Sequence, residues 1–281
     1  MSEARAVLRL PSGQLLPPLR VVDAEAVRLH EDADPRRVEA LVERLRQEDV
    51  LRNPPVAAPL PRGGYVVLDG ANRTVALRRL ELPAHVLQVV DYADAAVRLE
   101  VWHHLLQEDG DVLAALPPAR VERLTGVEVL LDALATRRAA CGLVTPDGVW
   151  GVRDGGALQE RVRAVRALVS AYAGRQAIYR VPTPDLPQLA AEYGRVAAVA
   201  VFPPFAKEEI LRLAELPEKL PTGVTRHVIP NRVLRLNLPL DILRGANSLE
   251  AKNAALHELL HARLLAHRVR YYAEPTLLLD E

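Results

Sequence analysis

Apolar residues in the first third of the chain alternate between the two-residue period of strands and the longer period of helices. Short apolar or β-branched runs predict strands at residues 19–22, 56–57, 65–68 and 85–90. Before the second of these strands, Val38, Leu41, Val42 and Leu45 recur at the spacing of one buried helical face. The pattern therefore predicts an α/β domain over residues 1–92.

Two helices of this domain carry signals for their first residues. Asp34 is a good cap and Pro35 a good first residue for the helix that holds the apolar face described above. The second helix, expected over residues 73–80, follows the central strand, and either Asn72 or Thr74 can cap it.

The remainder of the chain, residues 93–281, predicts a second α/β domain. Its expected elements are a strand at 98–104, two or three helices within 112–138, a hairpin over 140–152, a helix at 158–172, strands at 196–202 and 233–237, and a helix at 249–269 capped by Asn247. No repeat and no low-complexity linker separates the two parts. We therefore expect the domains to pack closely, with a cleft between them.

Composition narrows the functional classes. Lys and Arg together number 36, and Asp and Glu also number 36, so the formal net charge is zero. A general nucleic-acid-binding protein usually carries a basic excess, so that class is disfavoured. Cys141 is the only cysteine, which leaves no internal disulfide and no cysteine-based zinc site. Without a signal-peptide core or an apolar run of membrane-spanning length, we expect a soluble cytoplasmic protein with no membrane partner.

The stretch from Tyr65 to Leu80 combines a strand, a tight polar turn and a helix. Asp69 and Gly70 break the strand, and the N–H groups that open the following helix form the positive end of its dipole. Such a helix start suits a phosphate, and Arg73 and Asp69 flank it. Turns of this kind also occur without a ligand, so the pattern alone leaves phosphate binding and a plain structural turn both open.

The amino-acid sequence of this turn and of its flanks resembles the ParB/sulfiredoxin superfamily. The matching features are D-G-x-x-R at residues 69–73, R-N-P at 52–54 and the G-G-Y-V-V strand at 63–67. In that superfamily the turn holds nucleotide phosphates. ParB partition proteins continue into helix-turn-helix segments, which are absent from this sequence pattern, and sulfiredoxins need a cysteine where this chain has Ala71.

A third branch of the superfamily, the free-serine kinases (SerK/SbnI-like proteins), is similar over nearly the full length. The resemblance rests on His30-Glu31, Asp34-Pro35, Trp102-His103, V-F-P-P-F at 201–205, T-R-H-V-I-P at 225–230, and Asn237. It implies a ParB/sulfiredoxin-like N-terminal domain, an active-site cleft, and phosphorylation of free L-serine to O-phospho-L-serine. Many relatives have histidine where this chain has Asn72, so no histidine role transfers to that position.

The resemblance also implies roles for individual residues. Glu31 would be the general base for the serine hydroxyl, and Asp69 would bind Mg²⁺ or assist the base. The nucleotide phosphates of ATP or ADP would be held by Gly70, Ala71, Asn72, Arg73 and Thr74. The amino acid would be held by Trp102, His103, Thr225, Arg226 and His227, with Arg226 pairing with its carboxylate.

Two alternatives stay open at this point. The chain could be a ParB-like nucleotide-binding regulator without kinase chemistry. It could also be a zinc peptidase, because His257-Glu258-Leu259-Leu260-His261 is a literal H-E-x-x-H on a predicted helix. Leu264 disfavours the peptidase. Metzincin-type zinc peptidases have a glycine at this position, which turns the chain so that a third ligand, here at the position of His267, can reach the metal. The sequence distinguishes neither ATP from ADP nor cysteine synthesis from other fates of phosphoserine, and it leaves the oligomeric state open.

Overall fold

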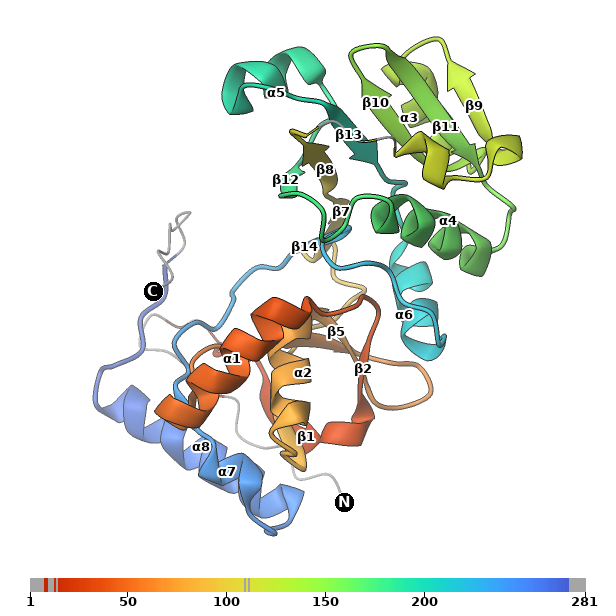
Figure 1. Ribbon diagram of the computed structural model, residues 1–281. Coiled ribbons are helices and arrows are strands. Elements are labelled where there is room, and N and C mark those ends of the chain that lie inside the picture. The colour runs from red at the N-terminus through yellow and green to blue at the C-terminus, as the bar shows by residue number, and fades with distance from the viewer. Residues whose placement is uncertain (1–7, 10–12, 14, 109, 111, 273–281) are drawn as a thin grey trace.

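The computed structural model describes residues 8–9, 13, 15–108, 110 and 112–272. The protein has two lobes, each built around its own sheet, and a short two-stranded ribbon lies between them (Figure 1). Mixed α/β architecture in both lobes confirms the predicted fold class.

The lower lobe in Figure 1 contains a five-stranded sheet in the order β1-β6-β4-β5-β2. Its strands are β1 (Leu19–Asp23), β2 (Val27–Leu29), β4 (Val56–Pro59), β5 (Tyr65–Asp69) and β6 (Ala84–Val89). The pairs β4–β6 and β2–β5 are parallel, whereas β1–β6 and β4–β5 are antiparallel. The sequence pattern did not predict β2, although this strand brings the chain to the site.

Local signals explain the two helices on this sheet. In α1 (Pro35–Glu48), the Asp34 side chain accepts hydrogen bonds from the N–H groups of Arg36 and Arg37, as its predicted role as cap requires. The helix α2 (Ala71–Arg79) begins earlier than predicted, and its N-cap is Gly70 rather than Asn72 or Thr74. Gly70 has φ of 98°, a left-handed conformation that disfavours residues with a Cβ.

The upper lobe contains a six-stranded sheet in the order β12-β8-β13-β10-β11-β9, and all its pairs are antiparallel. Its strands are β8 (His103–Leu106), β9 (Val121–Leu124), β10 (Ala139–Thr145), β11 (Gly148–Arg153), β12 (Tyr179–Val181) and β13 (Ala198–Val201). The helices α3 (Val127–Ala135), α4 (Leu158–Ser170), α5 (Leu186–Tyr193) and α6 (Lys207–Glu215) accompany this sheet, and α6 reaches down beside β2 (Figure 1). The predicted hairpin is confirmed as β10–β11, and buried Cys141 lies within it.

Several predicted elements of residues 93–138 differ from the structure. The single strand expected at 98–104 is divided at Trp102 into β7 (Arg98–Val101) and β8, which belong to different sheets. β7 pairs with β14 (Thr225–Val228) to form the ribbon between the lobes. The helices expected within 112–138 are two 3-10 turns (Leu113–Ala115 and Pro118–Arg120), the strand β9 and one α-helix, α3.

The C-terminal part of the described chain returns to the lower lobe. The helices α7 (Asp241–Arg244) and α8 (Leu249–Leu265) bury Leu243, Leu256 and Leu260 in one core with Val21 and Val38. The Asn253 amide on α8 bonds both the N–H and the C=O of Val21, which covers part of the β1 edge. The division at residues 92 and 93 stays a prediction, and this packing shows that the lower core also uses the end of the chain.

Three expectations for the C-terminal region are wrong in detail. Residues 233–237 form a loop instead of a strand, and only Leu238–Pro239 (β15) pairs, with β3 (Val50–Leu51). The cap of α8 is Ser248, whose hydroxyl accepts from the Ala251 N–H, not Asn247. The helix also ends at Leu265 rather than Val269, because His267 adopts a left-handed conformation with φ of 54°.

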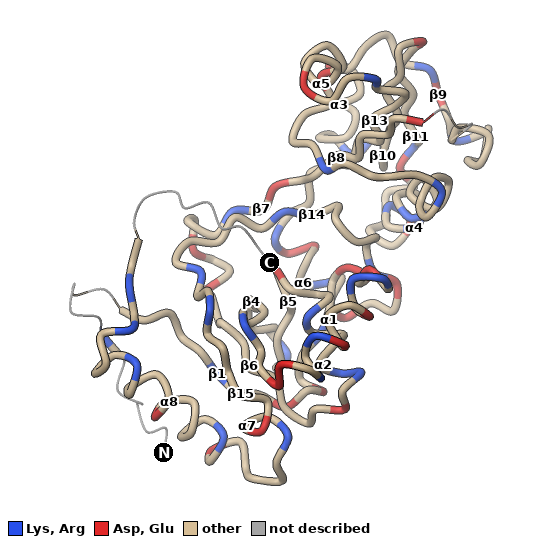
Figure 2. Tube along the Cα trace, turned by 60° about the vertical axis from the view of Figure 1, so that its left-hand side comes forward, with Lys and Arg blue, Asp and Glu red and all other residues tan. Residues whose placement is uncertain are grey.

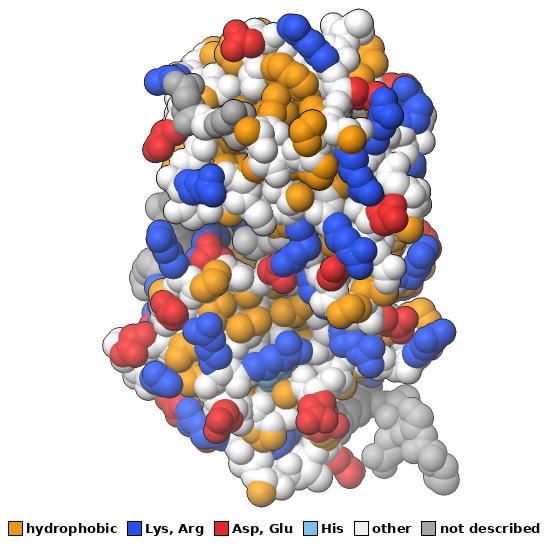
Figure 3. Space-filling model, turned by 45° about the vertical axis from the view of Figure 1, so that its right-hand side comes forward, with side chains coloured by type: hydrophobic (Ala, Val, Ile, Leu, Met, Phe, Trp, Pro, Cys, Tyr) orange, Lys and Arg blue, Asp and Glu red, His pale blue; other side chains and the backbone are white. Residues whose placement is uncertain are grey.

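Charge is distributed without one dominant sign. Lys and Arg alternate with Asp and Glu along both lobes (Figure 2), and the two kinds are interspersed on the face shown in Figure 3. Within the described ranges, no helix combines the length and the apolar character that a membrane span requires.

Candidate active site

Two acidic residues meet where two parallel strands end. The register of β2 and β5 aligns Leu29 with Val67, so Glu31 and Asp69 lie level with each other two residues further on. Neighbouring strands are about 4.8 Å apart, so the two carboxylates share one site. The N-terminal end of α2 follows Asp69 directly, which places the predicted phosphate turn at the same edge.

Glu31 is partly buried and has only weak hydrogen-bond partners. Its Oε2 atom is 3.4 Å from the donor N–H nitrogen of Gly223 and 3.3 Å from the Thr225 hydroxyl, both long contacts. Burial raises the pKa of Glu31 to about 7, and the nearby charge of Arg180 and the Gly223 contact only partly oppose it. A carboxylate with this pKa can accept a proton near neutral pH.

His30 organises the wall beside Glu31. Its Nδ1 is 2.8 Å from the Val67 carbonyl, which can only accept, so Nδ1 carries the hydrogen. Burial lowers the pKa of His30 to about 4, so the ring is neutral and its Nε2 accepts from the Thr225 hydroxyl at 2.8 Å. Because that hydroxyl has one hydrogen, and His30 is closer than Glu31, Thr225 is a weak donor to Glu31.

His227 lies on the same side of the ribbon. Its ring contacts His30 edge-on, with ring centroids 5.4 Å apart, and its Nε2 is 2.8 Å from the Tyr92 hydroxyl. Burial lowers the pKa of His227 to about 3, so it is neutral as well. Glu31 therefore lies beside two uncharged imidazoles and not beside histidine cations.

Asp69 has the opposite environment. Its Oδ2 accepts from Arg73 at 2.7 Å and also from Arg232. Burial alone would raise the pKa of Asp69, but the two guanidinium groups outweigh it and hold the pKa below its usual value. Asp69 is therefore ionised throughout the neutral range, as a ligand or charge partner of a metal–nucleotide complex must be.

The loop that carries Arg232 is fixed by polar contacts, two of them partly buried. The Gln88 amide, from β6, donates to the Asn231 carbonyl and accepts from the Val233 N–H, and Asn53 accepts from the Arg235 N–H. These bonds replace the strand pairing that we expected for residues 233–237. Sequence reasoning missed Arg232, although it directly follows the T-R-H-V-I-P stretch and Asn231.

The helix start at Gly70 fits a phosphate through its backbone. The first helical bond runs from the Thr74 N–H to the Gly70 carbonyl, so the N–H groups of Ala71 and Asn72 precede the ladder. Two side chains of the turn have local partners: Thr74 donates to the Gly70 carbonyl and Asn72 accepts from the Asp34 N–H at 2.8 Å. The Asn72 contact joins the starts of α1 and α2 without a histidine.

Arg73 is also engaged within the protein. Besides Asp69, its guanidinium donates to the carbonyls of Asn53 and Pro54 at 3.1 and 3.2 Å, which holds the R-N-P segment against α2. The predicted phosphate contacts of residues 70–74 stay a prediction. The structure favours the backbone N–H groups over the Thr74 and Arg73 side chains in that role.

The predicted amino-acid-binding residues divide between two faces. Thr225 and His227 point toward His30, and strand alternation turns Arg226 to the other face of the ribbon. There its guanidinium stacks on Trp102 at 4.4 Å and pairs with Glu100 at 3.3 Å. His103 is buried in β8, where its Nδ1 accepts from the Phe202 N–H at 3.3 Å. Trp102, His103 and Arg226 are thus not brought together with Glu31.

The H-E-x-x-H stretch lies on α8, away from this site. His257 and His261 stack with ring centroids 6.4 Å apart, and the helix ends before His267. Across the residues that the structure describes, no group of three histidine, cysteine or acidic side chains could hold a metal ion. Within the part of the chain that the structure describes, the peptidase alternative therefore gains no support.

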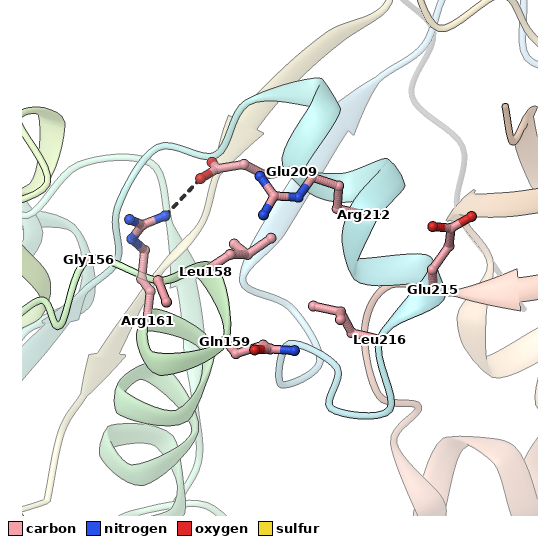
Figure 4. Close-up of a pocket in the computed structure, with 9 residues that line it drawn as sticks. Gly156, Leu158, Gln159, Arg161, Glu209, Arg212, Glu215 and Leu216 are labelled. Atoms are coloured by element: carbon pink, nitrogen blue, oxygen red, sulfur yellow. Dashed lines mark hydrogen bonds and ion pairs between the residues drawn. The ribbon is translucent and has the colours of Figure 1, made fainter.

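A separate pocket of ≈ 360 Å³ lies between α4 and α6 (Figure 4). Arg161 bridges Asp154 at 2.5 Å and Glu209 at 2.7 Å on its wall, and the Arg161 and Asp154 side chains are almost fully buried. Glu209 also pairs with Arg137. This network ties α4 to α6 and to α3's C-terminal end, so we assign it to the packing of the upper lobe.

Comparison with known proteins places these features in a family context. No protein-family model matches the chain. The ATP-dependent L-serine kinase SbnI of Staphylococcus aureus is 23% identical over 239 residues, which cover 83% of this chain and 86% of that protein. An ATP-dependent L-serine kinase of Staphylothermus marinus is 22% identical over 86% of this chain and 99% of its own length. The ADP-dependent L-serine kinase SerK of Thermococcus kodakarensis is 23% identical over 79% and 91%.

Solved structures show the same fold. C-terminally truncated SbnI from Staphylococcus aureus superposes with a TM-score of 0.71 at 20% identity, covering 87% of this chain and 96% of that one. A free serine kinase in complex with AMP gives a TM-score of 0.69 at 18% identity, with coverage of 85% and 97%. The expected resemblance to the free-serine kinase branch is confirmed, and so is its two-lobed fold.

Proposed function

We propose that this protein is a free L-serine kinase, which transfers a phosphoryl group from ATP or ADP to the serine hydroxyl. The observation that carries the proposal is the pairing of Glu31, with its pKa raised to about 7, with the phosphate-type helix start at Gly70 on one edge of the sheet. The curated relatives named as L-serine kinases support the same activity over most of the chain.

Different groups of the site would bind the donor phosphates, accept the proton and hold the base in position. Backbone N–H groups at the start of α2 would hold the phosphates of the donor. Glu31 would accept the hydroxyl proton as the serine oxygen bonds to phosphorus and the bond from phosphorus to the leaving nucleotide oxygen breaks. Thr225 and neutral His30 would keep the base in place without lowering its pKa to an ordinary value.

Mg²⁺ fits this site as a companion of the nucleotide. Asp69 is an ionised carboxylate at the phosphate turn, and it would hold the ion together with phosphate oxygens and water. The ion would supply charge neutralisation for the transferring group. Arg73 and Arg232 keep Asp69 ionised and oriented toward the turn. A cytoplasmic location and a role in cysteine biosynthesis stay predictions of the sequence.

Phosphorus NMR of the protein with L-serine, Mg²⁺ and either ATP or ADP tests the proposal. We expect a phosphoserine signal, and the nucleotide product, ADP or AMP, identifies the donor. Protein with Glu31→Gln is the control for contaminating kinases. Nucleotide binding without phosphoserine from either donor would contradict the proposal and favour the ParB-like regulator.

A further inference from the structure

The proposed substrate brings a carboxylate into the site, and Arg226, the arginine that sequence analysis offered for it, is engaged elsewhere, as are Arg73 and Arg232. Arg226 lies on the other face of the ribbon with Trp102 and Glu100. Arg73 and Arg232 share Asp69 on the phosphate side. A buried or half-buried substrate carboxylate needs a cationic partner, so another residue must supply it.

Arg180 lies beside the base and has no partner of its own. It is in β12, the edge strand of the upper sheet, opposite His104 in register (Figure 1). Among the residues that the structure describes, the Arg180 side chain makes no hydrogen bond or ion pair, whereas Arg161 and Arg166 in the same lobe are paired with acids. Arg180 is exposed at this edge of the sheet, and a guanidinium without a protein partner beside the site can bind an oxyanion.

Gly223 shows how close Arg180 is to Glu31. A Cβ atom on Gly223 would overlap the Arg180 guanidinium, so that group lies flat against the backbone of this residue. The N–H of the same glycine is the one that approaches Glu31 Oε2, at 3.4 Å. Gly223 also accepts a hydrogen bond from His104 Nε2 at 3.1 Å, which fixes its peptide plane. The surface beneath Arg180 is therefore rigid and adjoins the base.

The charges around Arg180 agree with this position. Burial lowers the pKa of Arg180. The carboxylates of Glu31, Asp34 and Asp69 oppose that shift, and the Arg37 cation at the start of α1 adds to it. Arg180 thus faces the acids of the lower lobe across the site. In serine the hydroxyl and the carboxylate are carried by neighbouring carbon atoms, so a carboxylate partner has to lie directly beside the base.

We propose that Arg180 binds the carboxylate of L-serine through its planar fork and so holds the hydroxyl against Glu31. This inference rests on the function proposed above and names the residue that gives the site its preference for an amino acid. The glycine at position 223 leaves the room that the guanidinium occupies. Sequence analysis had no signal for Arg180, because β12 was not among the predicted elements.

The test compares L-serine with L-serinamide, which keeps the hydroxyl and amine but lacks the carboxylate. The variants are Arg180→Gln and Arg180→Lys, with Arg123→Gln as a matched control, since Arg123 lies on β9 at the opposite edge of the same sheet. For Arg180→Gln we expect kcat/KM for L-serine to fall by about tenfold to a hundredfold, mainly through KM. Activity with L-serinamide and the KM for nucleotide should change by less than about twofold. Arg180→Lys should restore part of the loss.

Several results would overturn the proposal. Equal losses for L-serine and L-serinamide with unchanged KM values would place Arg180 on the phosphoryl group instead. No loss for either substrate would place the carboxylate elsewhere. Calorimetric binding of L-serine in the presence of AMP gives a readout without turnover, and binding equal to that of the unaltered protein would also refute the assignment. Unaltered protein that binds L-serine but forms no phosphoserine would refute only the kinase proposal, whereas failure to bind L-serine would refute both.

Discussion

Glu31 and Asp69 end neighbouring parallel strands, yet the protein gives them opposite electrostatic environments. Glu31 has two long hydrogen-bond contacts and neutral histidines beside it, and burial raises its pKa to about 7. Asp69 has two guanidinium partners that hold its pKa below the usual value. Carboxyl groups whose pKa values are driven apart in one site can divide proton transfer from charge neutralisation.

The difference comes from where the cations are fixed. Arg73 and Arg232 approach from α2 and from the 231–235 loop, both on the Asp69 side. On the Glu31 side, the segment from Gly223 to His227 contributes backbone, a hydroxyl and an imidazole, and the nearby Arg180 makes no ion pair with Glu31. The same local chemistry, an acid at a strand end, thus acquires two different electrostatic environments from its neighbours.

The largest expected effect is from Glu31→Gln. This change keeps the shape of the side chain and removes the base, so turnover should fall by about a hundredfold to ten-thousandfold. Nucleotide affinity, measured by calorimetry, should stay within about twofold. Turnover near that of the unaltered protein would show that Glu31 is not the base.

Asp69→Asn tests the second acid of the pair, on the phosphate side of the site. Loss of this charge leaves Arg73 and Arg232 without their shared acid and weakens any Mg²⁺–nucleotide contact, so we expect about a tenfold to hundredfold loss in kcat/KM for nucleotide. Titration with Mg²⁺ should show a higher requirement for the ion. An effect confined to KM for serine would contradict the assignment of Asp69 to the phosphate side.

Gly70→Ala tests the helix start between the two acids. The residue has φ of 98°, and a Cβ would lie 3.1 Å from Pro55 Cα and from Arg73 Nε. Gly63→Ala is the matched control, since it has φ of 93° and nothing within 4 Å. Both should lose about 1 kcal/mol of unfolding free energy from backbone strain. Only Gly70→Ala should weaken nucleotide binding, and equal binding losses would exclude a specific role for the turn.

The pH profile measures the pKa of Glu31 directly. The base must be ionised, so kcat/KM for L-serine should rise about tenfold per pH unit up to about pH 7 and then level off. Burial lowers the pKa values of His30 and His227 to about 4 and about 3, so these rings should not add a step there. A midpoint near the ordinary pKa of a glutamate would show that burial does not perturb this carboxyl.

The smallest expected effect is on stability. Because the folded-state pKa of Glu31 lies above the ordinary value of 4.5, its stabilising contribution is complete below about pH 4.5 and is lost as pH rises through about 7. Glu31→Gln should therefore raise Tm relative to the unaltered protein at about pH 8, with little difference at about pH 4.5. A Tm difference that does not depend on pH would contradict this linkage.

Local signals made the lower lobe the most predictable part of the molecule. The Asp34 cap, the Pro35 helix start, the central strand and the Asp69-Gly70 turn all depend on residues within a few positions of one another. The cap of α2 was misplaced because Gly70 itself adopts the left-handed conformation, which leaves Asn72 to bond Asp34. The resemblance carried by the T-R-H-V-I-P stretch then indicated the family and the fold.

By itself, then, the sequence determined the strand–turn–helix, its likeness to nucleotide-binding turns and the acid, Asp69, at its start. The tertiary structure alone decided which side chains surround Asp69 and Glu31, because the partners come from distant segments: Thr225 to His30, Arg232 to Asp69 and Arg180 beside Glu31. The tertiary structure also placed Arg226 on the opposite face of β14 from Thr225 and His227. Successive side chains of a strand point to opposite faces, and on that face Arg226 contacts Trp102. Periodicity along a chain specifies that a strand has two faces, but only packing specifies what each face meets.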